Sequence, residues 1–263
     1  MALTTIRQEQ GVVINEGSTD VDFRVESDNA THALFVQGSD GNVGIGTDTI
    51  TNPYDQTPHT NVNINGTWGG VISFKLGGTE KGWIGQRSSG NEDMVLGASS
   101  GQDLLFYTNG TNERMRIDLN GHVTMPTQSA FLARPASVQN NIAINTAVTA
   151  VLGTEIFDQN SDFTSNTFTA PVAGKYQFSM CLNGRAADSA AGYYEAQIVT
   201  SNRNYNFILD PDYGQDSVYF SLSGSALADM DLGDTAHLII VQNGGASQFD
   251  ISTETYLSGF LAC

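Results

Sequence analysis

Apolar and polar residues alternate over short runs along most of the chain. The alternation is clear in residues 21–25, 72–76, 115–119, 176–182 and 218–222. A period of two is typical of a β-strand with one buried face, and no segment of about ten residues or more has a convincing helical period. The pattern therefore predicts an all-β chain.

Pairs of a short polar residue and glycine separate many of these runs. Asn-Gly and Asp-Gly favour tight hairpins, because both central residues of a type I′ turn need positive φ. We expect turns at six such pairs: Asp40-Gly41, Asn65-Gly66, Asn109-Gly110, Asn120-Gly121, Asn183-Gly184 and Asn243-Gly244.

One internal repeat is visible. Residues 34–47 align without gaps on residues 114–127, and Gly41 falls on Gly121. Each copy predicts a strand, a glycine turn and a second strand. Two copies are too few for a solenoid, which generally needs three or more stacked repeats.

A strand with one strongly apolar face follows a predicted turn at Pro171 and Gly174, since proline presets φ and glycine accepts positive φ. Its apolar residues alternate with polar ones: Tyr176, Phe178, Met180 and Leu182. Residues 237–241 are apolar on both faces, as expected for a strand between a core and a subunit interface.

The C-terminal half resembles the jelly-roll heads of the complement first-component q subunit and tumour necrosis factor superfamily. The resemblance covers about residues 128–263, without the upstream Gly-X-Y repeat of complement itself. It rests on residues 130–134, 155–158 with Asn160, 168–178, 232–238, 249–250 and 256–261. It implies a trimeric jelly-roll β-sandwich that binds rather than catalyses.

Within the first copy of the repeat, residues 39–47 resemble a glycine-rich segment of bacteriophage tail-fibre and virion structural proteins. Together with the C-terminal head, it implies a homotrimeric virion fibre. Such a fibre would bind a host cell-surface receptor, either a glycan or a protein, through its head. The alternative is a purely structural role as a capsid decoration spike or a fibre connector.

Residues 48–113 are rich in Gly, Asn and Thr and have few apolar residues. So polar a segment buries too little apolar surface to offset roughly 1–2 kcal/mol of backbone entropy per residue. Three intertwined chains would solve this problem; a separate monomeric β domain is the alternative. The expected interior residues are Trp68, Phe74, Trp83, Leu104 and Phe106.

These features predict three parts. Residues 1–30 would attach to another virion structural protein, residues 31–127 would form the β-hairpin stalk, and residues 128–263 would form the jelly-roll head.

The net charge of −17, from 11 basic and 28 acidic residues, argues against nucleic acid and anionic membranes as partners. The N-terminus lacks the features of a signal peptide, and no run of about 18 apolar residues predicts a membrane span. We therefore expect assembly in the host cytoplasm and display on the virion. Cys181 and Cys263 fit no metal spacing and are expected to be free thiols.

Catalytic motifs are weak, and we expect no enzymatic activity. Ser99 stands in a Gly-x-Ser-x-Gly pattern, but a nucleophile elbow needs a following helix, and residues 102–107 look like a strand. Gly41, Gly44 and Gly46 do not fit a nucleotide-binding fingerprint. Glycan depolymerisation by paired carboxylates is the enzymatic alternative; it usually uses a long β-helix, of which the chain shows no rungs.

No cofactor is expected, and calcium is the one ion for which the sequence offers ligands. Asp210, Asp212 and Asp216 supply the oxygens that a hard cation prefers, although a solvated turn around Pro211 explains them as well. The four histidines, His32, His59, His122 and His237, are too scattered for a zinc site.

Candidate binding residues lie in the head. Exposed Tyr and polar side chains bind at low entropic cost, which favours a receptor site at Asn202, Arg203, Tyr205, Asp212 and Tyr213, in loops distal to the stalk. The expected trimer interface contains His237, Ile239 and Val241.

Overall fold

The structure is a computed structural model and describes residues 22–28, 30–39, 41–50, 62–66, 69–86 and 93–263. Every regular element in these ranges is a β-strand, which confirms the all-β prediction. No helix in the described ranges has the length and apolar character needed to cross a membrane. By its internal contacts the chain divides into residues 1–106 with 116–123, and residues 107–115 with 124–263.

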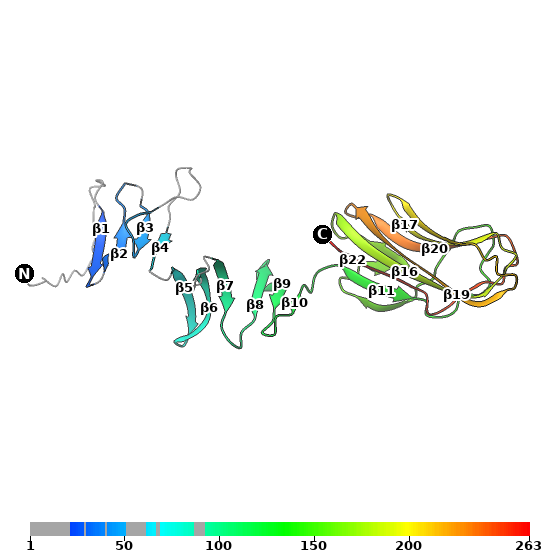
Figure 1. The fold of residues 1–263 in the computed structure, drawn as a ribbon, viewed down its shortest axis with the longest axis horizontal. Coiled ribbons are helices and arrows are strands. Elements are labelled where there is room, and N and C mark those ends of the chain that lie inside the picture. Colours follow the sequence, from blue (N-terminus) through cyan, green and yellow to red (C-terminus); the bar gives the residue numbers. More distant parts are fainter. Residues whose placement is uncertain (1–21, 29, 40, 51–61, 67–68, 87–92) are drawn as a thin grey trace, which may run out of the picture. The chain divides into compact units, whose positions relative to one another are not determined.

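The C-terminal half is a sandwich of two antiparallel sheets (Figure 1), which confirms a two-sheet jelly-roll head. The first sheet has the order β13-β11-β22-β16-β19, with β21 beside β16. Its strands are β11 (Ala130–Arg134), β13 (Thr154–Asp158), β16 (Gly174–Ala187), β19 (Ser217–Met230), β21 (Asp250–Ile251) and β22 (Tyr256–Leu261).

The second sheet has the order β14-β15-β20-β17-β18, with β12 beside β20. Its strands are β12 (Val148–Thr149), β14 (Phe163–Thr164), β15 (Thr167–Thr169), β17 (Tyr193–Thr200), β18 (Asn204–Leu209) and β20 (Thr235–Asn243).

The core lies between these sheets. The predicted apolar face of β16 is confirmed, because Tyr176, Phe178, Met180 and Leu182 are at most 1% exposed. Phe131 of the first sheet stacks on Phe163 and Phe168 of the second, with ring centroids 4.9 and 5.0 Å apart. Phe131 therefore packs the first strand of the head against the second sheet.

The predicted turn at Asn183-Gly184 is wrong. Both residues lie inside β16, where Asn183 pairs with Ser221 and Gly184 with Phe220. A Cβ on Gly184 would lie 2.1 Å from the Phe249 ring, so this glycine makes room for an aromatic side chain. The close approach of a ring, and not a turn, requires glycine here.

Three smaller sheets precede the sandwich. One contains β1 (Phe23–Ser27), β2 (Ala30–Val36), β3 (Val43–Ile45) and β4 (Val62–Ile64), the last parallel to β3. The others contain β5 (Val71–Leu76), β6 (Thr79–Gln86) and β7 (Met94–Ala98), and β8 (Leu104–Thr108), β9 (Asn112–Ile117) and β10 (Val123–Thr124). β5, the strand after Asn65-Gly66, pairs with β6 and not with β4, so the expected hairpin at this pair is wrong.

Both copies of the repeat form a hairpin, as predicted. In the first copy, β2 and β3 pair around Gly41, which has a φ of 71°. In the second, β9 and β10 are neighbours around Gly121, with a φ of 86°. The predicted turn between β8 and β9 is also present, because Asn109 and Gly110 have φ values of 52° and 82°.

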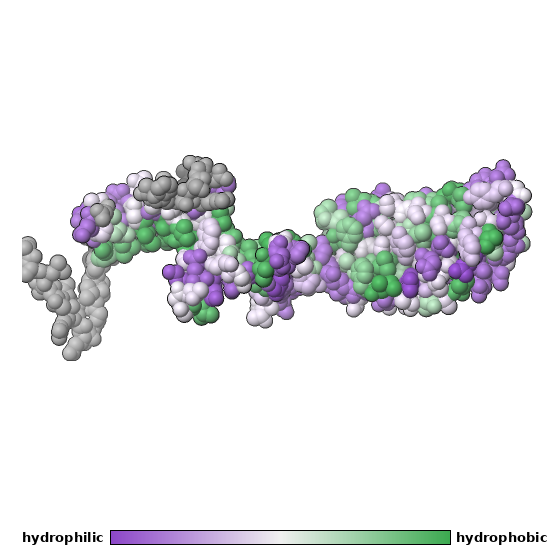
Figure 2. Space-filling model, turned by 60° about the horizontal axis from the view of Figure 1, so that its bottom comes forward, coloured by the Kyte–Doolittle hydropathy of each residue, from purple (hydrophilic) through white to green (hydrophobic). Residues whose placement is uncertain are grey.

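These small sheets have almost no buried core. Within the described residues before 129, Phe35, at 7% exposure, is the only buried hydrophobic side chain. Ile72, Ile84 and Leu96 form one row across β5, β6 and β7, and Ile72 and Leu96 are each 48% exposed. Apolar residues are visible on the surface of the small sheets in Figure 2.

The residues predicted to lie inside a trimeric stalk are largely uncovered in the single chain. Phe74 and Phe106 are 53% and 40% exposed, and Trp83 and Leu104 are half-buried. Trp68 lies outside the described residues. The side chain of Trp83 packs over Gly97, where a Cβ would lie 2.8 Å from the indole ring.

Candidate functional site

The sandwich has two distinct ends. At the proximal end, where the chain enters at Ala130, the Leu261 N–H donates to the Ser129 carbonyl at 3.0 Å, and Lys175 N–H donates to the Cys263 carbonyl at 2.7 Å. At the distal end, four turns meet: residues 140–145, 187–192, 210–217 and 243–249.

Asp216 joins three of the distal turns. Its Oδ1 accepts hydrogen bonds from the Ser189 N–H at 3.0 Å and the Ser189 hydroxyl at 2.9 Å, and its Oδ2 accepts one from Gln248 Nε2 at 2.9 Å. These bonds, above all that from the Ser189 backbone, hold the pKa of Asp216 below its ordinary value. Asp216 is therefore a carboxylate in a fixed position.

A second carboxylate, that of Asp188, holds two of these turns together. Asp188 is 8% exposed and accepts the N–H groups of Ala190, at 2.8 Å, and Ala246. The Asp188 N–H donates to the Tyr194 hydroxyl at 2.8 Å, and burial raises the pKa of Tyr194 to about 12. The distal turns thus rest on a buried polar network.

A hollow of about 310 Å³ lies beside this network at the distal end of β16 and β19. Arg185 pairs with Tyr219 across the two strands, and its guanidinium carbon lies 5.6 Å from the centroid of the tyrosine ring. The lining residues are Arg185, Ala186, Asp216, Ser217, Val218, Tyr219 and Gln248. The hollow therefore combines an aromatic ring, a cation, a carboxylate and an amide.

The walls of this hollow differ from an ordinary strand surface in two ways. Ala186 has a φ of 51°, in the left-handed region that costs a residue with a Cβ about 1–2 kcal/mol. Val218 and Tyr219 are 68% and 64% exposed at the edge of the sheet. Residues with strained backbone cluster at active sites and ligand clamps, which makes this hollow a candidate binding site.

The sequence pattern does not predict this hollow. Its polar residues come from three separated parts of the chain. The pairing of β16 with β19 brings Arg185 close to Ser217, and the Gln248 amide joins them through its hydrogen bond to Asp216. The available sequence signal was weak: Val218 continues the apolar alternation of Phe220 and Leu222, although it faces solvent instead of the core.

The structure does not bring the five predicted receptor residues together. Asn202 and Arg203 lie at the proximal end, where Asn202 Nδ2 donates to the Asp229 carbonyl at 2.9 Å and Arg203 lies 3.1 Å from the Asp229 carboxylate. Asp212 and Tyr213 lie at the distal end, beyond the six residues of β18. The predicted location of all five in distal loops is thus wrong for Asn202 and Arg203.

Tyr205 was predicted to be an exposed loop residue, and this is also wrong. It belongs to β18, pairs with Ile198 and packs half-buried against the core. As the second residue of β18, it alternates with the exposed Asn204 and Asn206 and points inward. Tyr213, by contrast, is 49% exposed.

The predicted interface residues His237, Ile239 and Val241 lie half-buried on the outward face of β20. Leu238 and Ile240, on the other side of the strand, are fully buried. Burial lowers the pKa of His237. The strand is thus apolar on both sides, as expected, but in the single chain its outward residues are already partly covered.

On the outward face of the first sheet, which contains β16 and β19, several apolar side chains are more exposed than these residues of β20. Leu227 and Phe260 flank Gln177 in one row across β19, β16 and β22, and are 57% and 50% exposed. Phe157 on β13 is 50% exposed.

The aspartates considered for calcium do not form a compact group of ligands. Within the described part of the chain, no three His, Cys, Asp or Glu residues are placed to hold a metal ion. Asp216 is instead hydrogen-bonded to Ser189 and Gln248.

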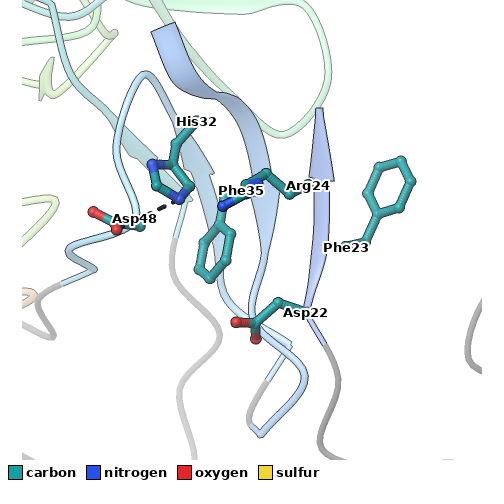
Figure 3. Close-up of a pocket in the computed structure, with 6 residues that line it drawn as sticks. All are labelled: Asp22, Phe23, Arg24, His32, Phe35 and Asp48. Atoms are coloured by element: carbon teal, nitrogen blue, oxygen red, sulfur yellow. Dashed lines mark ion pairs between the residues drawn. The ribbon is translucent and has the colours of Figure 1, made fainter. Parts of the chain in front are cut away.

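A second hollow, of about 610 Å³, lies in the β1–β4 sheet (Figure 3) and is lined by Asp22, Phe23, Arg24, His32, Phe35 and Asp48. His32 Nε2 lies 3.5 Å from Asp48 Oδ2, and Asp22 Oδ1 accepts the Gly38 N–H at 2.9 Å. The described lining residues include no hydroxyl or thiol nucleophile. The arrangement is a histidine–aspartate contact beside a buried ring.

Ser99 follows β7 and precedes β8, so a strand and not a helix comes after the Gly-x-Ser-x-Gly pattern. Its hydroxyl donates to Glu80 at 3.3 Å. This strand–turn–strand geometry differs from the strand–turn–helix of a nucleophile elbow.

No protein-family model matches the chain, and no curated protein matches it by sequence. Among solved structures, it is similar to the globular domain of zebrafish complement 1qA protein, with 20% identity over 52% of this chain and 98% of that chain, and a TM-score of 0.39. Murine APRIL is 12% identical over 51% of this chain and 99% of that chain, with a TM-score of 0.39. Eiger TNF from S. frugiperda is 8% identical over 51% and 91%, with a TM-score of 0.38.

Proposed function

We propose that the protein is a homotrimeric fibre of a bacteriophage virion, and that its C-terminal sandwich attaches the particle to a host cell-surface receptor. Its action is non-covalent binding without catalysis. The fibre assembles in the host cytoplasm and joins another virion protein through residues 1–30.

The contrast between the sandwich and the small sheets supports this proposal most directly. The sandwich has its own core, whereas the sheets of β1 to β10 expose apolar side chains such as Val62, Leu76 and Met94, each at least 62% exposed. A single-layer sheet without a packed face is marginally stable in water. Further copies of the chain would cover these faces.

The copy number of three rests on the resemblance of residues 128–263 to trimeric jelly-roll heads. Two faces of the head could form the contact between copies: the outward face of β20 with His237, Ile239 and Val241, or the opposite sheet with Leu227 and Phe260. The larger exposed fractions of Leu227 and Phe260 favour the second face.

Receptor binding is proposed at the distal end of the sandwich. Its turns are fixed by Asp188 and Asp216, so a ligand would meet a preorganised surface and lose little conformational entropy there. Three copies would present three equivalent sites, and binding at several sites at once raises the apparent affinity well above that of one site.

Cell binding tests this function. Fluorescently labelled protein should bind cells of the host bacterium saturably and should block adsorption of the phage. An intact trimer that neither binds the cells nor blocks adsorption would contradict receptor binding. That result would favour a capsid decoration spike or a fibre connector.

A further inference from the structure

We propose that the hollow between Arg185 and Tyr219 binds a neutral sugar ring at the end of a host surface glycan. This inference rests on the proposed function and names the class of receptor. It follows from the chemistry of the lining residues, from their fixed positions and from the size of the hollow.

The aromatic side chain provides the stacking surface. Tyr219 is 64% exposed at the edge of the sheet, and Val218, which is 68% exposed, also lines the hollow. The C–H groups on one face of a pyranose ring form an apolar surface that packs on the face of an aromatic ring. Arg185 sits over the same tyrosine and restricts its position.

The polar groups match the needs of sugar hydroxyls, each of which donates one hydrogen bond and accepts others. Arg185 supplies donors only, whereas Asp216 supplies acceptors. Asp216 has about four acceptor positions and uses three, for Ser189 and Gln248. Gln248 donates its amide N–H to Asp216, which fixes the orientation of the amide and leaves its carbonyl oxygen as an acceptor.

Charge favours a neutral ligand over an acidic one. Asp216 remains a carboxylate at neutral pH and lines the hollow, and the whole chain has a net charge of −17. A sugar with its own carboxylate would be repelled by both. A neutral ring can instead bridge the Arg185 donors and the Asp216 acceptor.

The volume limits the size of the ligand. At about 310 Å³, the hollow lies at the small end of the roughly 300–1,000 Å³ that ligand pockets span. It would hold one terminal sugar residue, while the rest of the glycan remained in solvent. A single such site binds weakly, so three copies would be needed for firm attachment.

The test uses the full-length labelled protein on a surface of immobilised oligosaccharides. Some end in glucose, galactose, mannose or N-acetylglucosamine, and others end in glucuronate or sialate. The protein should bind at least one neutral terminus and prefer it to the acidic ones. Tyr219→Ala should lower the affinity for that terminus at least about tenfold, which corresponds to 1.4 kcal/mol.

Three further variants sharpen this test. Tyr219→Phe keeps the ring and should retain binding, and Arg185→Met removes the donors and should weaken it about tenfold. Leu232→Ala removes an exposed apolar side chain of the head, 74% exposed, in the proximal turn between β19 and β20, and should leave sugar binding unchanged. Thermal unfolding of each variant shows whether a loss of binding reflects a loss of fold.

Several results would overturn the inference. They are a preference for acidic termini, no binding to any sugar terminus, or equal binding by Tyr219→Ala and the unchanged protein. Dissociation of the trimer by Tyr219→Ala without a sugar ligand would identify the hollow as a contact between copies. If the unchanged trimer binds host cells and Tyr219→Ala binds them equally well, the inference fails while the proposed function stands.

Discussion

At the scale of single residues, several positions of the head require glycine because aromatic rings leave no room for a Cβ. A Cβ on Gly259 would lie 2.6 Å from the Phe178 ring and 2.9 Å from the Phe131 ring. A Cβ on Gly224 would lie 2.2 Å from the Phe207 ring. Closely packed cores have no room for an added methyl group unless side chains leave their preferred rotamers. The terminal Ser-Gly-Phe-Leu segment therefore has a packing reason for its glycine.

This packing predicts the effect of one substitution. Gly259→Ala should lower the free energy of unfolding by about 1–3 kcal/mol, because the rings of Phe131 and Phe178 must move. Gly153→Ala is the matched control, since its Cβ would meet only Ala136 at an ordinary 3.5 Å. Chemical denaturation measures both changes. Equal stability of the two variants would contradict the packing argument.

At the scale of elements, the sequence pattern predicted strands better than it predicted where residues of different strands meet. The alternation in β16 and the turns at Gly41, Gly110 and Gly121 are local properties, and the structure confirms them. Asn183-Gly184 was misassigned because its glycine is required by Phe249, which lies 65 residues later in the chain.

The candidate site was harder to predict for the same reason. Asn202 and Asp212 are close in sequence, but β18 carries them to opposite ends of the sandwich. Arg185, Asp216 and Gln248 are far apart in sequence, and strand pairing brings them to one hollow. Neither relation can be derived from spacing along the chain, because strand register is set by the packed sheets.

The hairpin of β9 and β10 provides an element-scale prediction about pH. Asp118 Oδ1 accepts the N–H groups of Asn120 and His122 at 2.8 and 2.9 Å, and Oδ2 lies 2.9 Å from His122 Nδ1. These bonds, foremost that with the His122 side chain, lower the pKa of Asp118 from 3.8 to about 2. The folded hairpin thus favours the carboxylate.

The contribution of Asp118 should be fully present above pH 3.8 and should be lost as the pH falls toward 2. Titration of the Asp118 carboxyl carbon by NMR measures its pKa. In His122→Ala the pKa should rise toward the ordinary aspartate value, because the largest cause of the shift is removed. An unchanged pKa in this variant would contradict the assigned cause.

At the scale of the whole molecule, one chain contains a self-sufficient sandwich and several sheets that are not self-sufficient. In the described residues, buried hydrophobic side chains concentrate after residue 130, whereas exposed ones such as Ile72, Leu96 and Leu119 occur throughout the preceding sheets. Association of identical chains would bury these side chains. Leu227→Lys and Ile239→Lys each place a charge on one of the two candidate contact faces of the head. The variant that no longer assembles identifies the face at which the copies meet.

The most direct test of the central claim is sedimentation equilibrium of the full-length protein at micromolar concentration. We predict a single species with three times the 28.1 kDa mass of the chain. Dilution should not dissociate it readily, because many apolar side chains along β1 to β10 would be buried between copies. A stable monomer at this concentration, with its sheets folded, would contradict the trimeric fibre.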